Sequence, residues 1–491
     1  MKGPCLILGG GATALSVARY LQRMQIPFAL VEPDVESLPQ LENSLEESGI
    51  RAEAILATEV WPEQWLQWAE SAIASPGIPP WHPMVEQVQR AGLKLYSDLD
   101  VFVQAVRKPD ASGAQVVLVT GSNGKSTTVQ LLSAMGRASG HCVHTGGNLM
   151  PPALDLLPQG DAAYEEAGSA IYILEVSSFQ LEYSGALNAD VAAVINLASD
   201  HMDRHLHMRR YGDIKRQIYS GARVAVFNLA DPATIPPPWC KADRLCFNAQ
   251  SDALAEPPDV QLSRFSVSDV MLCRNGLEWW PFSALGVRRQ DTGQDTGKQD
   301  FALDFAMVPP GMAENAVAAC TLAELLGFTP EAMLQALEEY TALPHRCQPI
   351  WGSEGIIWID DSKATNPASS AAAIEAVFQA QRRRAPEGRL ILIAGGQTKA
   401  AHLEVLRQAL ESRVDLVLLV GADAHLMEQA AEGVCPFERC GNLRRAVSRA
   451  AQQSTSGDVV LLSPAGASLD AFDSYADRGR QFFQAVQELA A

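Results

Sequence analysis

Short apolar runs alternate with amphipathic stretches along the chain, and several of these runs end in polar residues. Residues 116–119 form one such run, and the glycine-bearing turn at 121–124 follows it. A helix is expected to begin at about Ser126. The same strand–turn–helix order recurs on both sides of this segment. Strands that alternate with helices predict parallel sheets of the α/β class.

The pattern divides the chain into three segments. Residues 1–110 contain a strand, a glycine-rich turn and a second strand, and residues 111–343 contain the segment described above. Residues 344–491 repeat the alternation, with strands expected at 356–359, 390–394, 415–420 and 458–462 and a helix at 368–378. A chain of 491 residues usually forms about three domains. We therefore predict three α/β domains with these boundaries.

The turn Thr-Gly-Ser-Asn-Gly-Lys-Ser-Thr at residues 120–127 predicts a nucleoside triphosphate site. Its glycines let backbone N–H groups converge on an anion, and the following helix N-terminus adds partial positive charge. Lys125 supplies a full charge, and the hydroxyl of Ser126 or Thr127 is a candidate magnesium ligand. Val119 stands where the strict G-x-x-x-x-G-K pattern has its first glycine. An incidental glycine- and serine-containing turn is the alternative.

A second glycine pattern, G-x-G-x-x-A, occupies residues 9–14 between two strands, and the second strand ends on Glu32. This arrangement is typical of dinucleotide sites, so an NAD-dependent oxidoreductase is an alternative function. No later segment offers a hydride-transfer site. The glycine pattern alone therefore favours a nucleotide-binding domain of unspecified ligand.

Glu175 and His201 follow two further apolar runs of the central segment. Open α/β sheets bind ligands at the carboxyl ends of their strands. A carboxylate and a neutral imidazole beside bound phosphates suit a divalent cation. The alternatives are a solvated strand end for Glu175 and a histidine paired with a neighbouring aspartate for His201.

Composition excludes several classes of function. The net charge of −19 argues against nucleic acid or an anionic membrane surface as the main partner. Nine cysteines show no paired C-x-x-C spacing, and His201, His205 and His207 lack the usual glutamate and third ligand, so zinc is not expected. The chain shows no apolar leader and no apolar run of about 18 residues. We expect a cytoplasmic protein without membrane insertion.

Six motifs together resemble the Mur ligases of peptidoglycan synthesis. In chain order they are T-G-S-N-G-K-S-T, E-V-S-S-F-Q-L-E, D-H-M-D-R, L-P-H-R, D-D-S-K-A-T-N and L-L-S-P-A-G-A-S-L-D. The resemblance spans all three segments. It implies a Rossmann-like N-terminal domain that binds a UDP substrate, a P-loop-type central ATPase domain and a Rossmann-like C-terminal domain that binds glutamate.

The resemblance also implies an activity. Cytoplasmic ATP-dependent addition of D-glutamate to UDP-N-acetylmuramoyl-L-alanine through an acyl phosphate is expected, with Mg²⁺ and a monomeric chain. An L-glutamate-adding variant fits the motifs equally well. A folylpolyglutamate synthetase would lack the last motif. A nucleotide-sugar sensor without catalysis would tolerate the loss of Lys125, Glu175, His201 and Lys215, all of which are present.

The matched motifs assign roles to individual residues. The ATP contacts are Gly121, Ser122, Asn123, Gly124, Lys125, Ser126, Thr127, Asn315, Arg346 and Asp361. The metal ligands are Ser126, Glu175, His201 and Lys215, the last as a carbamylated lysine; Lys125, Lys215, His201 and Glu175 are the catalytic set. The substrate contacts are Thr13, Glu32, Ser75 and Gly77 for the uridine diphosphate, Asn148, Ser177 and Gln180 for the muramoyl part, and Thr365, Lys399, Ser468 and Tyr475 for glutamate.

The sequence departs from the family pattern at four places. Gly311-Met312 replaces a His-Asn pair on the adenine side, and Pro33 replaces a hydroxyl residue near the uracil. Tyr475 stands for a common phenylalanine, and Gly466 replaces a cysteine. The last two changes lie at the expected amino-acid pocket.

Overall fold

The structure is a computed structural model of the chain. It describes residues 3–107, 113–158, 170–248, 260–263, 265–268, 271–274, 277–281, 311–340, 344–351, 355–397 and 403–489. The chain divides into two compact units. The first unit comprises Met1–Leu197, His201–Ser266 and Val317–Gln335, and the second comprises Ala198–Asp200, Val267–Ala316 and Ala336–Ala491.

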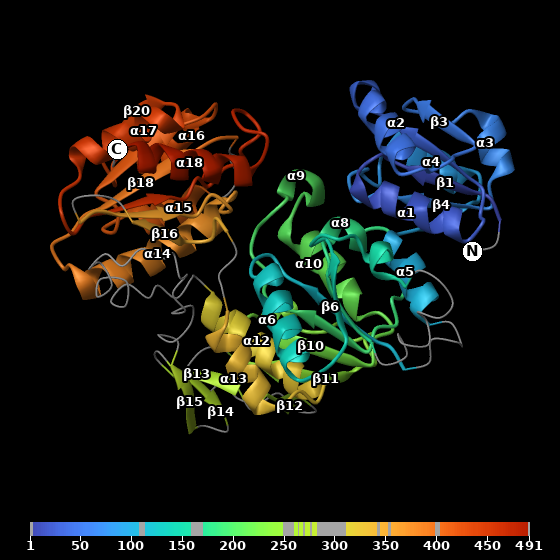
Figure 1. The fold of residues 1–491 in the computed structure, drawn as a ribbon, viewed down its shortest axis with the longest axis horizontal. Coiled ribbons are helices and arrows are strands. Elements are labelled where there is room, and N and C mark those ends of the chain that lie inside the picture. Colours follow the sequence, from blue (N-terminus) through green and yellow to red (C-terminus); the bar gives the residue numbers. More distant parts are fainter. Residues whose placement is uncertain are drawn as a thin grey trace. The chain divides into compact units, whose positions relative to one another are not determined.

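The N-terminal sheet has five parallel strands in the order β3-β2-β1-β4-β5 (Figure 1). The strands are β1 (Cys5–Leu8), β2 (Phe28–Glu32), β3 (Ala54–Ala57), β4 (Ser71–Ala74) and β5 (Lys94–Tyr96). The helices are α1 (Ala12–Arg23), α2 (Leu38–Glu47), α3 (Glu63–Trp68), α4 (Pro83–Arg90) and α5 (Asp98–Val106). This order confirms the Rossmann-like prediction. The strand order reverses at β1: β2 and β3 are added on one side of it, and β4 and β5 on the other.

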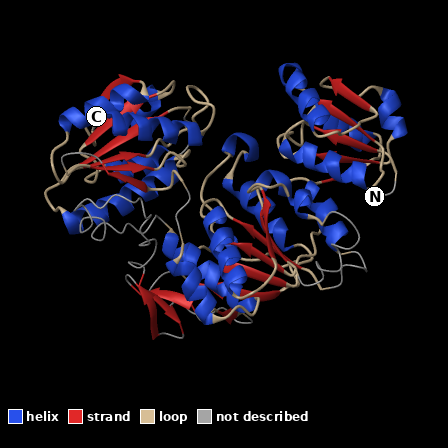
Figure 2. Ribbon diagram, viewed as in Figure 1, coloured by secondary structure: helices blue, strands red, loops and turns tan. Residues whose placement is uncertain are grey.

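Both faces of this sheet are covered because β1 is apolar at every position. Cys5 and Ile7 belong to one hydrophobic core, while Leu6 and Leu8 belong to another on the opposite face. Side chains of a strand alternate between faces, so four consecutive apolar residues require helices on both sides. Figure 2 shows helices flanking the strands of the sheets.

The central sheet has seven parallel strands in the order β12-β11-β10-β9-β6-β8-β7. The strands are β6 (Gln115–Thr120), β7 (Val143–Gly147), β8 (Ile171–Glu175), β9 (Val191–Val194), β10 (Val224–Asn228), β11 (Asp243–Phe247) and β12 (Gln261–Leu262). The helices are α6 (Lys125–Ala138), α8 (Ser178–Leu181), α9 (Met202–His205), α10 (Met208–Arg216), α12 (Met312–Leu325) and α13 (Pro330–Glu338). The order reverses at β6, which lies between β8 and β9.

Helix α5 packs against this central sheet. A capping box starts the helix: the Ser97 hydroxyl accepts from the Asp100 N–H at 3.1 Å, and the Asp100 carboxylate accepts from the Ser97 N–H at 2.9 Å. The Phe102 ring of α5 then meets the Tyr172 ring of β8 edge-on, with centroids 5.3 Å apart. One hydrophobic core therefore contains residues of both sheets.

The C-terminal sheet has six strands in the order β16-β17-β21-β18-β19-β20. The strands are β16 (Gln348–Trp351), β17 (Ile357–Asp360), β18 (Leu390–Gly395), β19 (Leu416–Val420), β20 (Phe437–Gly441) and β21 (Val459–Leu462). The helices are α14 (Pro367–Arg384), α15 (Leu403–Leu410), α16 (Ala424–Ala431), α17 (Leu443–Gln453) and α18 (Tyr475–Leu489). A separate small sheet contains β13 (Phe265–Ser268), β14 (Met271–Arg274) and β15 (Leu277–Pro281).

The four strands predicted in this last segment are confirmed to within a residue, but β16 and β20 were not predicted. β16 pairs antiparallel with β17 and contains Pro349, and β20 is mostly exposed or half-buried. Edge strands tolerate proline and polar residues, so they carry no continuous apolar run. Helix α14 also extends beyond the predicted 368–378 at both ends.

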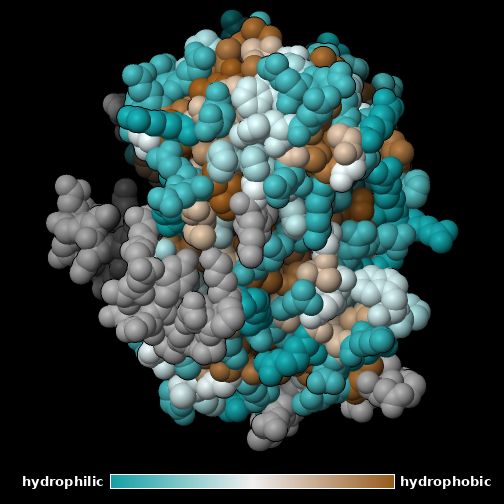
Figure 3. Space-filling model, turned by 90° about the vertical axis from the view of Figure 1, so that its right-hand side faces the viewer, coloured by the Kyte–Doolittle hydropathy of each residue, from teal (hydrophilic) through white to brown (hydrophobic). Residues whose placement is uncertain are grey.

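Hydrophilic side chains predominate on the face drawn in Figure 3, and hydrophobic ones form small separate patches. Among the described residues, no helix combines the length and the apolar character needed to cross a bilayer.

Candidate active site

The predicted phosphate loop joins the end of β6 to the start of α6. Gly124 caps the helix in the left-handed region, with φ of 76°. Asn196, which follows β9, holds the loop: its Oδ1 accepts from the N–H groups of Ser122 at 3.1 Å and Asn123 at 2.9 Å. Its Nδ2 donates to the Asn123 carbonyl at 3.1 Å. The loop is therefore fixed by a side chain from the neighbouring strand end.

Lys125 lies back over this loop. Its Nζ donates to the carbonyl oxygens of Gly121 at 2.9 Å and Ser122 at 2.8 Å. The ammonium group is thus held at the loop, where it can neutralise an anion bound at the N-terminus of α6. Thr127 is buried in the first turn of the helix.

Glu175 ends β8 and is brought directly to the phosphate loop. Its Oε2 accepts from the Ser126 hydroxyl at 2.6 Å, and its Oε1 accepts from the Asn148 side-chain amide at 2.7 Å. The residue is 3% exposed. Gly147 lets the end of β7 lie close to Glu175, because a Cβ at Gly147 would lie 2.4 Å from the Glu175 carbonyl oxygen. The alternative of a solvated strand end for Glu175 is therefore wrong.

The donor set around Glu175 fits a magnesium ion. Within the described part of the chain, the side-chain oxygens of Glu175 contact a hydroxyl and an amide and form no ion pair. A buried carboxylate without a positive partner is costly, and a divalent cation beside a hydroxyl ligand would remove that cost. No group of three His, Cys, Asp or Glu side chains suited to a metal occurs among the described residues. Mg²⁺ commonly takes one or two carboxylates and completes its shell with water and phosphate.

Lys215 lies on α10 and is buried, with 2% of the residue exposed. Its Nζ donates to the Thr120 hydroxyl at 3.0 Å, at the last residue of β6. It also lies 5.1 Å from the centre of the Tyr211 ring, whose hydroxyl is 3.0 Å from the Ser122 hydroxyl. Lys215 is therefore a buried residue of its helix and faces the base of the phosphate loop.

His201 lies at the start of the short helix α9. It caps α9 in the left-handed region, with φ of 54°, and its ring centre is 4.8 Å from that of Phe179 on α8. His205, at the other end of α9, is fully buried, and its Nε2 is 2.9 Å from the Ser178 hydroxyl. Burial lowers the pKa of His205 to about 4, so its imidazole is neutral at neutral pH.

Ser177 and Gln180 shape the same region through a capping box on α8. The Ser177 hydroxyl accepts from the Gln180 N–H at 3.2 Å, and Gln180 Oε1 accepts from the Ser177 N–H at 3.1 Å. Gln180 Nε2 donates to the buried Asp98 carboxylate at 3.1 Å. Burial raises the pKa of Asp98 to about 6.

In the N-terminal sheet, the predicted uridine diphosphate contacts lie at or after the ends of β1, β2 and β4, and the strand order reverses between β1 and β4. Gly9, after β1, has φ of 94°, and a Cβ there would lie 3.0 Å from the Ser75 Cβ after β4. Ser75 is buried, and its hydroxyl has no hydrogen-bond partner among the described residues. Glu32 ends β2, Thr13 lies in the first turn of α1, and Gly77 is exposed in the loop after β4. A buried hydroxyl with unused bonding capacity fits a ligand contact.

The second unit holds most of the remaining predicted residues. Asp361 follows β17 and is buried, and its carboxylate accepts from the Cys347 N–H at 3.2 Å and the Ser463 hydroxyl at 2.7 Å. Burial raises the pKa of Asp361 to about 7. The Tyr475 ring centre is 4.1 Å from Lys363 Nζ. The others are Asn315, buried on α12, Arg346, Thr365 and Ser468, while Lys399 lies outside the described residues.

Several residues that organise these sites were not predicted. Arg478 of α18 is 1% exposed and donates to the hydroxyl and carbonyl of Ser362 at 2.9 and 2.8 Å and to the Gly466 carbonyl at 3.1 Å. It thereby joins the loops after β17 and β21. Asn196 could have been identified from the sequence, because it is a polar residue that follows an apolar run. Asp98 and Arg478 lie within helices, and nothing in the local pattern marks them.

Family models cover most of the chain in three consecutive matches. The N-terminal domain of MurD-like Mur ligases matches residues 4–97, the Mur ligase middle domain matches 119–272, and the glutamate ligase domain of Mur ligases matches 345–466. The chain belongs to the Mur ligase family. The resemblance inferred from the six motifs is thereby confirmed.

Curated relatives match this Mur ligase over nearly its whole length. The UDP-N-acetylmuramoylalanine–D-glutamate ligase of Pseudomonas aeruginosa is 35% identical over 499 residues, covering 99% of this chain and 98% of the relative. The enzyme of the same name from Legionella pneumophila strain Philadelphia 1 is 32% identical over 487 residues, covering 99% of each chain.

Solved structures share the fold of this Mur ligase. The UDP-N-acetylmuramate–alanine ligase of Thermotoga maritima matches with a TM-score of 0.57 at 16% identity and 99% coverage of each chain. A pseudomurein peptide ligase type C from Methanothermus fervidus matches with a TM-score of 0.54 at 15% identity and the same coverage. These likenesses confirm the three-domain α/β architecture.

The first prediction concerns the side chain that holds the phosphate loop. Asn196→Ala removes the side-chain acceptor of the Ser122 and Asn123 N–H groups. We expect it to weaken ATP binding about tenfold, since a polar group left without its hydrogen-bond partner costs about 1–3 kcal/mol. Isothermal titration calorimetry with ATP measures the change. Asn43→Ala, at an exposed position of α2, is the matched control and should bind like the wild type. Equal affinity for both variants would contradict the role of Asn196.

The second prediction concerns the buried Asp98. Its folded-state pKa of about 6 lies above the ordinary value of 3.8, so the folded chain retains a proton that the unfolded chain releases. The free energy of unfolding should therefore fall as pH rises from about 4 to 6. Asp98→Asn should remove this fall and leave the variant more stable above pH 6, by on the order of 1–3 kcal/mol. Urea unfolding across this range measures the difference.

Asp243→Asn, at an exposed position of β11, is the control for that experiment and should keep the wild-type pH dependence. An Asp98→Asn curve that runs parallel to the wild type would show that Asp98 ionises normally in the fold.

Proposed function

We propose that this chain is an ATP-dependent amide ligase that joins D-glutamate to UDP-N-acetylmuramoyl-L-alanine. The observation that carries the proposal is the Ser126–Glu175 pair beside Lys125, in a chain whose full-length relatives have that enzyme name. The domain boundaries at 110 and 343 and the assigned site residues are part of the proposal. We further propose a monomer that acts in the cytoplasm.

The chemistry requires activation of a carboxylate. A carboxylate is a poor acyl donor until its oxygen becomes a good leaving group. Transfer of the γ-phosphoryl group of ATP to the substrate carboxylate gives an acyl phosphate and ADP. The N-terminus of α6 and the Lys125 ammonium offset the negative charge on the phosphates during this transfer. The glutamate amine then attacks the acyl carbon, loses a proton, and inorganic phosphate leaves.

No side chain of the proposed site needs to act as a nucleophile. The contribution of the chain is positioning and fixed charge. Ser126, Glu175, His201 and a carbamylated Lys215 would hold Mg²⁺, which when bound supplies positive charge at the transferring phosphoryl group. The hydrogen bonds from Ser126 and Asn148 to the Glu175 carboxylate support this assignment.

The two organic substrates are assigned to different sheets. We assign the uridine diphosphate to the reversal point between β1 and β4, where the buried Ser75 hydroxyl has unused bonding capacity. We assign glutamate to Thr365, Lys399, Ser468 and Tyr475. The departures from the family pattern at Gly466 and Tyr475 fall at or beside these assigned residues, so both enantiomers of glutamate are compared.

The deciding assay is phosphate release from ATP with UDP-N-acetylmuramoyl-L-alanine, Mg²⁺ and an amino acid. We expect release with D-glutamate and little with L-glutamate. Lys125→Ala should reduce the rate by about 10²-fold or more, because loss of one preorganised charge contact has that magnitude. Lys241→Ala, at an exposed loop position, is the charge-matched control. Preference for L-glutamate would overturn the enantiomer, and amino-acid-independent release would overturn the reaction.

A further prediction tests the carbamate at Lys215. Lys215→Ala should lose most of the activity, and added acetate or bicarbonate should restore part of it by placing a carboxylate near the end of β6. Lys215→Arg keeps the positive charge but fills the space, so it should be inactive and should not respond. Steady-state phosphate release measures the activity of Lys215→Ala and Lys215→Arg, each with and without the added anion. Full activity of Lys215→Ala, or an identical response of both variants, would contradict carbamylation.

A further inference from the structure

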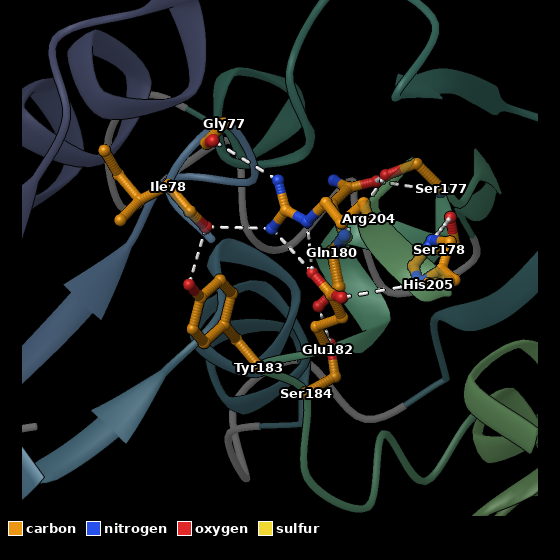
Figure 4. Close-up of polar contacts among 10 residues, drawn as sticks. All are labelled: Gly77, Ile78, Ser177, Ser178, Gln180, Glu182, Tyr183, Ser184, Arg204 and His205. Carbon is orange, nitrogen blue, oxygen red and sulfur yellow. Dashed lines mark hydrogen bonds and ion pairs between the residues drawn. The ribbon is translucent and has the colours of Figure 1, made fainter. Parts of the chain in front are cut away.

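Arg204 of α9 is a buried arginine whose guanidinium binds polar groups of three residues in the first unit. Its Nε and Nη2 lie 2.7 and 2.6 Å from the Glu182 Oε2. Its Nη1 donates to the Gly77 carbonyl at 3.2 Å, and Nη2 donates to the Ile78 carbonyl at 2.8 Å. Figure 4 shows the side chain reaching from the α8–α9 region to the loop after β4. The residue is 8% exposed.

A second side chain holds the same loop. The Tyr183 hydroxyl donates to the Ile78 carbonyl at 2.6 Å, so this oxygen accepts from two donors. Tyr183 directly follows Glu182, the ion-pair partner of Arg204. The loop from the N-terminal sheet is therefore held through backbone carbonyls by two neighbouring side chains of the central domain (Figure 4).

On its other side, Arg204 is joined to His201. The guanidinium lies 4.2 Å from the centre of the Phe179 ring, and this ring lies 4.8 Å from that of His201. The Arg204 N–H also donates to the His201 carbonyl at 3.0 Å. Helix α9 is one turn long and His201 caps it, so His201 and Arg204 share one short backbone segment.

The loop that Arg204 grips contains two of the residues assigned to the uridine diphosphate, Ser75 and Gly77. The turn that carries Arg204 begins at His201, which is assigned to the metal beside the ATP phosphates. Arginine suits this place because its planar fork serves a carboxylate and two carbonyls at once and stacks on an aromatic ring. A lysine has a single donor centre and cannot reproduce this set.

We propose that Arg204 is a positioning residue that couples occupation of the loop after β4 by the UDP-linked substrate to the placement of His201 for the metal–nucleotide. Arg204 is assigned to neither ligand, and its role is exerted through the loop and through Phe179. The inference rests on the proposed function for the identity of the two ligands. A purely structural anchor would support the fold without linking the two binding events.

The experiment measures binding of UDP-N-acetylmuramoyl-L-alanine to the full chain by calorimetry, with and without Mg²⁺ and a non-hydrolysable ATP analogue. In the wild type, Mg²⁺ with the ATP analogue should tighten binding of the UDP-linked substrate by about tenfold. This factor is within the usual range of coupling between sites. Arg204→Lys and Tyr183→Phe should each bring this ratio close to one. Arg90→Lys is the matched control and should keep the wild-type ratio. Arg90 is an exposed arginine of α4 that forms an ion pair with Glu86.

Kinetics give a second readout on the same variants. Arg204→Lys and Tyr183→Phe should raise the KM for the UDP-linked substrate by several-fold more than they lower kcat. If Arg204→Lys fails to fold by circular dichroism, Tyr183→Phe decides alone. A wild-type ratio of one, or variants with the wild-type ratio, would overturn the inference. Coupled binding without glutamate-dependent phosphate release would instead overturn the proposed reaction and leave the coupling standing.

Discussion

The hydrogen bond from the Ser126 hydroxyl to Glu175 is the contact on which the central site depends. It joins the first turn of α6 to the end of β8, and it exists because β6 and β8 are adjacent and in register, with Val119 opposite Glu175. On the other side of β6, Asn196 extends from the end of β9 to the loop N–H groups. Three neighbouring strand ends thus form one site at the point where the strand order reverses.

The same site contains buried ionisable side chains and a strained backbone position. Glu175 and Lys215 are both buried, and their polar atoms reach hydroxyl and amide partners at 2.6–3.0 Å. His201 adopts a left-handed backbone that is unfavourable for a residue with a side chain. Buried charge and backbone strain of this kind persist where surrounding structure enforces them, and they gather at functional sites. The costs therefore support the assignment of function to this edge of the sheet.

Sequence patterns predicted the parts of the site that follow from local order. Lys125 and Glu175 could be placed together because each follows a buried strand and parallel strands share one carboxyl edge. Burial of Lys215 could not be predicted from its helix, since its environment comes from Thr120 on a distant strand. Asp98 and Arg478 were missed for the same reason: each lies within a helix, and its partners are Gln180 in one case and Ser362 and Gly466 in the other. Edge strands β16 and β20 were missed because they lack the apolar runs of central strands.

The departure of the phosphate loop from the strict glycine pattern has a structural reason. Val119 is fully buried and is paired on both sides, with Glu175 of β8 and Ala193 of β9, so this position belongs to the sheet and cannot be part of a loop. The turn must therefore begin at Gly121, which passes so close to β9 that a Cβ would lie 2.5 Å from the Ile195 side chain. Asn196, the next residue along, binds two N–H groups of this short loop. These bonds explain how a shortened loop can keep a fixed arrangement.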